Sequence, residues 1–239
     1  MSSLRSDLLI NPQELFDISV STTSDGTQLG GLATTGDGRY FRYAKAGATA
    51  LVPGKLQQSS AEATGNENLG VAAAAIGDTS ITTTSTVTVT ADQYAGGYVV
   101  VTTTPGQGYQ YQIAGHAAAT SAVVTLNLTD PIQVALTTSS VIDLVANPYN
   151  GVVVNPTTAT GLPVGVAVAA TPANYYGWIQ TGGVGTVLAD GSITVGTNLV
   201  ASNGTAGAVE PLTGVQALVG VAVTGIATTE YGAVNLLLN

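Results

Sequence analysis

Residues 81–90 read Ile-Thr-Thr-Thr-Ser-Thr-Val-Thr-Val-Thr, and this stretch indicates the fold class. All its even positions are threonine, whereas Ile81, Val87 and Val89 fall on odd positions. Successive side chains of a strand point to opposite faces, so a period of two separates the threonines from the aliphatic side chains. The pattern predicts a half-exposed antiparallel strand with threonine toward solvent.

The composition extends this prediction to the whole chain. Only 8% of the 239 residues are charged and 30 are glycine, and β-branched residues with glycine punctuation favour strands and turns. We therefore expect an all-β protein of antiparallel β-barrel or sandwich modules with a short N-terminal arm. Further strands are expected at 39–43, 98–101, 109–113, 123–128 and 234–238.

Two short helical segments are also expected. Asn11 precedes Pro12 and stands three residues before Glu14, which is the pattern of a helix start with Asn as the cap. Asp130 and Pro131 would begin the second segment in the same way, and it would continue to Leu136.

Three segments differ in character. Residues 1–60 form an N-terminal arm with the first strands, residues 61–150 form a Thr-rich β module, and residues 151–239 form a C-terminal β module. The last contains an internal repeat, 164–180 and 219–235, because Val-Gly-Val-Ala-Val and a later Tyr-Gly recur at an offset of 55 residues (Val164 to Val219). The common offset predicts two copies of one hairpin.

The basic residues are confined to the first quarter of the chain. The last of them is Lys55, whereas the net charge of the chain is −9. A surface without cations cannot neutralise phosphates, so we expect no nucleic acid and no membrane partner. The segregation suggests that the N-terminal end faces an acidic partner or the electronegative body of a neighbouring copy.

Reactive side chains are scarce. Cysteine is absent, His116 is the only histidine, and the 14 carboxylates are scattered along the sequence. The glycine-rich stretches lack a following lysine, which a phosphate-binding loop needs. We therefore expect no cofactor, no metal and no enzymatic activity, and we interpret His116 as a turn or surface residue. The N-terminus lacks the apolar region of a signal peptide, so we expect synthesis in the cytosol without an anchor.

The aromatic residues form the strongest interaction signal. Such residues can belong to the sheet core, to a subunit interface or to a sugar-binding platform. We expect core or interface rather than sugar binding, because sugar sites usually add charged hydrogen-bonding partners. The residues assigned to a subunit interface are Tyr109, Tyr111, Tyr175, Tyr176, Trp178 and Tyr231.

Several strings resemble a known family. Asp37-Gly38-Arg39-Tyr40-Phe41-Arg42-Tyr43, Leu51-Val52-Pro53-Gly54-Lys55-Leu56 and Gly177-Trp178-Ile179-Gln180-Thr181-Gly182-Gly183 are similar to capsid decoration (cement) proteins of tailed bacteriophages. The strings 108–115, 147–152 and 196–199 continue the resemblance. It implies a non-enzymatic virion protein, commonly a homotrimer, made in the host cytoplasm and bound to the major capsid protein on the outer capsid surface.

These observations leave three functional hypotheses. The first hypothesis is a decoration protein that bridges capsid subunits and stabilises the shell, with its N-terminal end docked on the capsid through Arg5, Arg39, Arg42, Lys45 and Lys55. An alternative is a receptor- or glycan-binding module of a phage fibre or surface adhesin, which the tyrosines and Trp178 would serve. A carbohydrate-active enzyme is the third hypothesis, and it requires two carboxylates in one cleft.

Overall fold

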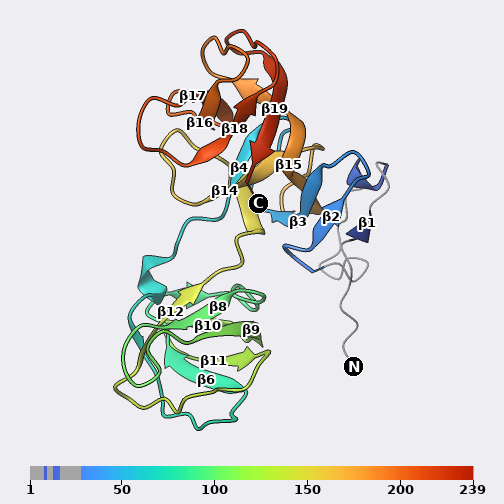
Figure 1. Cartoon of the computed structure of the whole chain (residues 1–239). Coiled ribbons are helices and arrows are strands. Elements are labelled where there is room, and N and C mark those ends of the chain that lie inside the picture. The colour runs from blue at the N-terminus through green and yellow to red at the C-terminus, as the bar shows by residue number, and fades with distance from the viewer. Residues whose placement is uncertain (1–7, 10–12, 17–27, 239) are drawn as a thin grey trace. The chain divides into compact units, whose positions relative to one another are not determined.

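The computed structural model describes residues 8–9, 13–16 and 28–238, and these residues form an almost entirely β structure (Figure 1). Their only helical segments are the 3₁₀ turns η1 (Glu14–Phe16) and η2 (Thr64–Asn66). The chain divides into two compact units, one formed by residues up to 61 together with those from 148 onward, and one formed by residues 62–147. The all-β prediction is confirmed. Of the predicted N-terminal helix start, Asn11 and Pro12 lie outside the described residues, and η1 begins at Glu14.

The strands of the first unit are β1 (Leu8–Leu9), β2 (Leu32–Thr34), β3 (Tyr40–Ala46), β4 (Leu56–Gln58), β13 (Asn150–Val154), β14 (Pro163–Ala167), β15 (Tyr176–Ala189), β16 (Asn198–Ala201), β17 (Ala208–Pro211), β18 (Leu218–Ala222) and β19 (Tyr231–Leu237). The strands of the second unit are β5 (Leu69–Gly70), β6 (Ser80–Thr84), β7 (Thr88–Val89), β8 (Tyr98–Val101), β9 (Gln110–His116), β10 (Ala119–Thr120), β11 (Val123–Leu128) and β12 (Val141–Val145).

Strand pairing in the first unit closes twice into a barrel. The first barrel runs β3-β13-β4-β14-β15 and returns to β3, and the second runs β15-β17-β16-β18-β19 and returns to β15. Strand β15, 14 residues long, belongs to both barrels, since residues 176–180 pair with β3 and β14 whereas residues 182–188 pair with β19. Each barrel contains one parallel pairing, β3–β13 or β15–β17.

The two barrels are structural repeats of each other. Val166 pairs with Gln180 in the first barrel, and Val221 pairs with Asn235 at the offset of 55 residues in the second. Outside the hairpins, the bridge Leu51–Thr171 corresponds to the bridge Ile193–Ile226. The backbone N–H groups of Gly54 and Gly196 donate to the carbonyl oxygens of Ala167 and Ala222 at 2.8 and 2.9 Å. The predicted hairpin repeat is therefore part of a larger repeat of all five strands.

The interiors of the two barrels differ in polarity. Both contain small aliphatic residues at equivalent positions, such as Ala46 in the first barrel and Ala189 in the second. Three positions that hold Leu199, Ile226 and Leu236 in the second barrel hold buried Gln57, Thr171 and Thr181 in the first. The apolar transfer term, at roughly 25 cal/mol per Å² of buried apolar surface, is therefore larger for the second interior.

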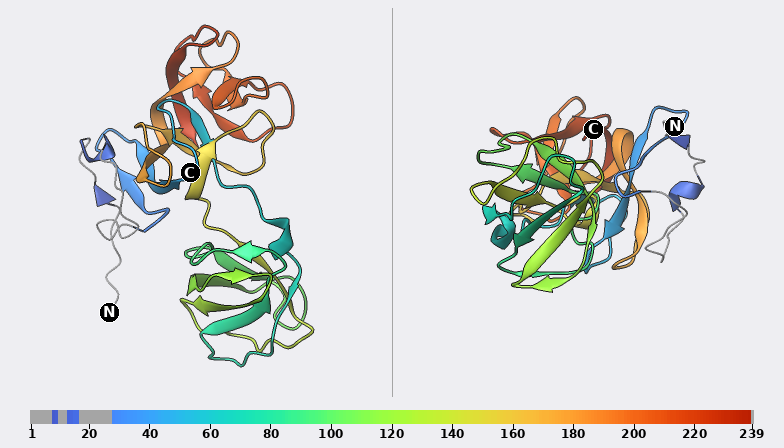
Figure 2. Two further views of the ribbon diagram at one scale, coloured as in Figure 1. Left: turned by 180° about the vertical axis from the view of Figure 1, so that it is seen from behind. Right: turned by 90° about the horizontal axis from the view of Figure 1, so that it is seen from below.

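The second unit has its own core and its own ring of strands. Its sheet runs β5-β12-β8-β9-β11-β6, and a bridge between Val71 and Thr83 joins the two edges. Figure 2 shows these strands, coloured from teal through green to yellow, curving around a common interior. Seventeen buried residues from Leu69 to Leu144 fill that interior.

Two local predictions in this unit need correction. Residues 81–90 keep the predicted faces, with Ile81 and Val89 buried and Thr84 exposed, but they form two strands rather than one. The extended strand is interrupted between β6 and β7, where the Ser85 hydroxyl donates to Asn66 Oδ1 at 2.6 Å. Residues 130–136 are not helical, because Leu136 forms a β-bridge with Ala74 and is buried.

The predicted division at residue 60 also differs from the pairing. Strands β3 and β4 belong to the first barrel together with β13–β15, so the N-terminal strands and the C-terminal module form one unit. Residues 62–147 lie within the connection from β4 to β13. The equivalent connection in the second barrel, from β16 to β17, spans only residues 202–207. Unit 62–147 is thus an insertion into one hairpin of a duplicated barrel.

An insertion of this kind should be removable. Replacing residues 60–151 with the seven-residue sequence of 202–208 should leave a two-barrel protein with a β circular dichroism spectrum and a single cooperative thermal transition. Residues 62–147 produced alone should also unfold cooperatively, because their core is internal. Failure of the shortened chain to fold would show that the first barrel requires the inserted unit.

Candidate functional site: an interaction surface around strand β3

An aromatic cluster covers the outer face of the first barrel. Phe41 and Tyr43 come from β3, and Tyr176 and Trp178 come from β15 directly beside it. The ring centroids of Tyr43 and Trp178 lie 5.1 Å apart in an edge arrangement. The alternate residues Ala44 and Ile179 point into the barrel. Leu15 of η1 and Ala33, which pairs with Phe41 across β2 and β3, complete the cluster, and all six of its side chains are buried.

Three predicted contact cations lie along this strand, each over an aromatic ring. The Arg39 guanidinium is 5.5 Å from the Phe41 centroid, and the Lys45 ammonium is 5.6 Å from the Tyr176 centroid. Arg42 lies 6.0 Å from the centroid of Tyr149 and donates from Nη1 to the Gly30 carbonyl at 2.9 Å. Half-exposed cation–π pairs contribute about 0.5–1 kcal/mol each. β3 and the turn before it therefore hold three cationic side chains over aromatic rings, and Arg39 among them is ion-paired with Asp37.

The other two predicted cations lie elsewhere. Lys55 is half-buried in the turn before β4, where its side chain lies against Gly207. Arg5 lies outside the described residues. The structure thus places Arg39 directly before β3 and Arg42 and Lys45 on opposite faces of β3, and it separates Lys55 from them.

Burial changes the titration of the tyrosines beneath these cations. Desolvation raises the pKa of Tyr176, and the neighbouring Tyr43 raises it further. Desolvation also raises the pKa of Tyr149, while the positive charge of Arg42 acts in the opposite direction. Both phenols therefore stay neutral at physiological pH and lie close to the cations as uncharged rings.

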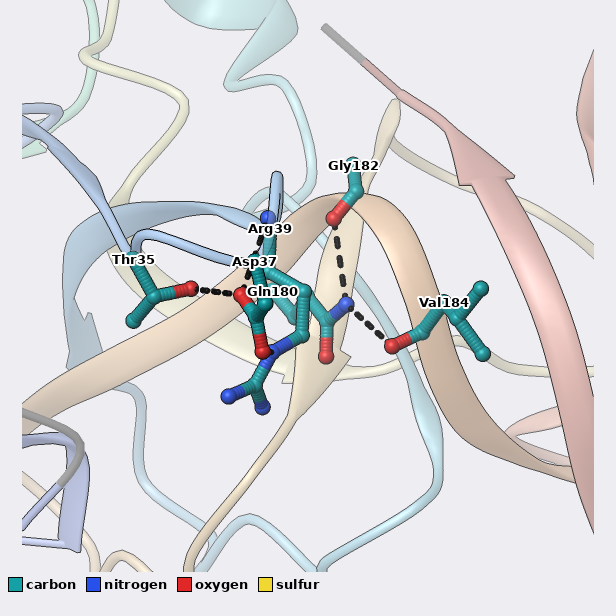
Figure 3. Close-up of polar contacts among 6 residues, drawn as sticks. All are labelled: Thr35, Asp37, Arg39, Gln180, Gly182 and Val184. Atoms are coloured by element: carbon teal, nitrogen blue, oxygen red, sulfur yellow. Dashed lines mark hydrogen bonds and ion pairs between the residues drawn. The ribbon is translucent and has the colours of Figure 1, made fainter.

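The turn between β2 and β3 fixes Arg39. Thr35 Oγ1 donates a short hydrogen bond to Asp37 Oδ1, and Arg39 Nε donates to Asp37 Oδ2 at 2.8 Å (Figure 3). The Thr35 hydroxyl, and then Arg39, lower the pKa of Asp37. Gly38 has a φ of 85°, which the turn requires and which glycine adopts without a steric penalty.

This turn packs against the point where β15 passes from one barrel to the other. The Gln180 amide donates from Nε2 to the carbonyl oxygens of Gly182 and Val184, both at 3.0 Å, and so spans the register shift in the strand (Figure 3). A Cβ on Gly183 would lie 2.7 Å from the carbonyl oxygen of Gly38. The absence of a side chain at Gly183 therefore allows the β2–β3 turn to pack closely against β15.

The predicted interface aromatics divide into two groups. Tyr111, Tyr176 and Trp178 are 3%, 6% and 7% exposed, so they belong to the cores of one copy and the interface assignment is wrong for them. Tyr111 faces the core of the inserted unit, and Tyr176 and Trp178 pack with Leu15 and Ala33, contacts that alternation alone does not reveal. Tyr109 and Tyr231 are exposed, and Tyr175 is half-buried.

His116 is a structural residue rather than a turn or surface residue, which corrects the prediction. It is buried at the end of β9, and its Nε2 accepts a hydrogen bond from the Tyr94 backbone N–H at 3.0 Å. Its Nδ1 lies 3.0 Å from the Ala117 carbonyl oxygen. This arrangement requires the neutral tautomer with the proton on Nδ1. His116 is thus engaged on both ring nitrogens and does not act as a free base.

One pair of carboxylates meets in space. The Glu62 side chain raises the pKa of Glu67 through a shared hydrogen bond and through charge repulsion, and Asp143 adds to the repulsion. The Glu62 side chain is exposed and Glu67 is half-exposed, both in the segment around η2. A general acid needs a desolvated site, so the pair lacks the environment that the hydrolase hypothesis requires.

Removal of the Gln180 amide should destabilise the first unit. In Gln180→Leu, the buried carbonyl of Gly182 and the part-buried carbonyl of Val184 lose their donor, and the free energy of unfolding should fall by about 2–3 kcal/mol in urea titration. Gln133→Leu is the matched control, because exposed Gln133 also bonds a carbonyl, and it should cost under about 0.5 kcal/mol. Equal effects of the two changes would contradict a bracing role for Gln180.

The Glu62–Glu67 contact predicts a pH-dependent stability. The folded protein raises the pKa of Glu67 above its ordinary value of 4.5, so stability falls as the pH rises through this range and Glu67 ionises. Glu67→Gln should therefore raise the thermal midpoint at pH 7 and have little effect at pH 3.5. A pH-independent difference between the two proteins would refute the repulsion.

Comparisons with known proteins add no identification. Within the described part of the chain, no group of three or more His, Cys, Asp or Glu side chains is placed to hold a metal ion. The described part of the chain contains no helix that is long and apolar enough to cross a membrane. Family models, curated proteins and solved structures gave no match for this chain.

Proposed function

We propose that this chain is a non-enzymatic structural protein that binds the outer surface of an icosahedral phage capsid and bridges capsid subunits. The resemblance to decoration proteins supports the proposal, and two of its strings lie in the candidate surface. The string 37–43 forms the β2–β3 turn and most of β3, and the string 177–183 forms the part of β15 beside it.

The cations on and beside β3 are the observation that carries the proposal. Arg39 and Lys45 lie over rings of the outer aromatic cluster, and Arg42 lies over Tyr149 on the other face of β3, so few rotamers are lost when they meet a partner. An acidic protein surface is the natural complement of Arg39 and Lys45. Capsid subunits with exposed carboxylates would provide such a surface.

The polar chemistry of the chain supports a scaffold rather than a catalyst. His116 is bonded on both ring nitrogens, and the Asn66 amide donates to the Tyr94 hydroxyl at 2.7 Å in the same core. Gln180 braces the backbone of β15. These side chains hold strands in place and are not poised to attack a substrate.

Stabilisation of the shell would follow from mass action. A protein that binds only the assembled lattice lowers the free energy of the assembled state, by about 2.7 kcal/mol per site at a concentration of 100 times Kd. The barrels contribute by keeping the binding surface in one geometry. The glycan-binding alternative loses its main support, because Trp178 is buried beneath the N-terminal segment.

Binding to isolated shells tests the proposal. The chain should co-sediment with empty capsids of the phage that encodes it and raise their disassembly temperature. Arg39→Gln/Lys45→Gln should weaken binding at least tenfold, about 1.4 kcal/mol, and added salt should weaken wild-type binding. Glu210→Gln/Glu230→Gln, a matched pair of amide substitutions, should not weaken it. Absence of wild-type binding to assembled shells would refute the proposed function.

A further inference from the structure

Gln57 lies inside the first barrel, and only one end of its amide is hydrogen-bonded within the described residues. The side chain is completely buried, and Nε2 donates to the Lys55 carbonyl oxygen at 2.8 Å. No N–H or O–H group among the described residues donates to Gln57 Oε1, which is itself buried. Exchanging the two ends of the amide would not help, because Oε1 would then face the Lys55 carbonyl, which is also an acceptor. The bond to Lys55 therefore fixes an acceptor without a protein donor inside the barrel.

The next residue of the same strand shows the usual state of a buried glutamine. Gln58 is also buried, its Nε2 donates to Thr160 Oγ1 at 2.8 Å, and its Oε1 accepts a hydrogen bond from the Thr160 backbone N–H at 3.3 Å. Most buried polar side-chain atoms are bonded in this way, either to protein or to ordered water. The carbonyl of Gln57 therefore needs a donor that the described residues do not supply.

The second barrel shows the same interior in an apolar form. Strand register matches four interior residues of the first barrel with more apolar or larger residues of the second: Gln57 with Leu199, Ala44 with Val187, Thr171 with Ile226 and Thr181 with Leu236. All of these residues are buried, and Ile179 against Val234 is the one apolar pair in which the first barrel holds the larger side chain. The first interior is thus more polar and is lined mostly by equal or smaller side chains. Waters are buried in polar interiors of this kind, whereas apolar interiors stay dry.

We propose that the interior of the first barrel contains a bound water that donates a hydrogen bond to Gln57 Oε1. A buried water makes about three hydrogen bonds, so it needs polar partners besides this oxygen. The interior offers hydroxyl groups, among them that of Thr171, whose bond to the Ala169 carbonyl oxygen is long at 3.4 Å. The second barrel has Leu199 at the position of Gln57 and needs no such water. The inference does not depend on the capsid function, because it concerns the interior of the barrel and not its surface.

Magnetic relaxation dispersion of the water signal tests the proposal on the full chain, since it counts water molecules that stay bound for longer than the protein takes to tumble. Gln57→Leu introduces the residue of the second barrel, and it should remove one long-lived water relative to wild type. Gln58→Leu is the matched control, because Gln58 is buried on the same strand and is bonded at both ends to Thr160, and it should retain that water. An equal water count in wild type and Gln57→Leu would overturn the inference.

Thermal melts give a second readout. The Lys55 carbonyl keeps the Ala167 backbone N–H as a donor at 3.2 Å, so Gln57→Leu should leave the thermal midpoint unchanged or raise it. Gln58→Leu removes two hydrogen bonds to the loop at Thr160 and should lower the midpoint. If Gln57→Leu lowers the midpoint as much as Gln58→Leu does, Gln57 is bonded by the protein and the proposed water is wrong.

A crystal structure of the wild-type chain gives the same answer should Gln57→Leu fail to fold. Electron density for a water at hydrogen-bonding distance from Gln57 Oε1 is expected. A protein group that donates to this oxygen instead would overturn the inference.

Discussion

The fold depends on one strand that serves two barrels. β15 forms the closing pairings with β3 in one barrel and with β19 in the other, and nearly all of its side chains are buried. The register of β15 against β3 shifts between Gln180 and Gly182, next to the backbone carbonyls of residues 182–184. Gln180 bonds two of these carbonyls, and Gly183 allows the β2–β3 turn to approach. The candidate surface on β3 is thus positioned by the same residues that join the barrels.

Duplication of the barrel allows the two copies to take different roles. The first barrel has a more polar interior, with Gln57 and Thr171 where the second has Leu199 and Ile226. It also carries the covered aromatic face, the cations and the inserted unit. The second barrel has the more apolar interior. Interior polarity and surface chemistry therefore differ between two repeats of one design, as is expected when a single fold hosts different surfaces.

Sequence reasoning predicted what depends on neighbouring residues. The alternation in 81–90 gave the correct faces, and the Val-Gly-Val-Ala-Val repeat located two hairpins of identical register. The extent of the repeat was missed, although Leu51 and Gly54 precede β4 by the same spacing as Ile193 and Gly196 precede β16. Two small or aliphatic residues are too weak a signal in a chain so rich in glycine and valine.

What could not be predicted depends on pairings distant in sequence. β3 pairs with β15 across more than a hundred residues, and no local pattern reveals that the N-terminal strands close a barrel with the C-terminal ones. The burial of Trp178 and His116 follows from such long-range packing, so their assignments were wrong. The segregation of the cations is a property of the sequence itself, whereas their positions over aromatic rings required the fold.

Hydrogen–deuterium exchange followed by mass spectrometry tests the shared-strand account most directly. If β15 closes both barrels, the peptides covering 176–189 should be the slowest to exchange in the first unit, and β4, β14, β18 and β19 should lose protection together as denaturant is added. Loss of protection in β18 and β19 at a denaturant concentration where β4 and β14 remain fully protected would contradict the account, since the barrels would then unfold independently.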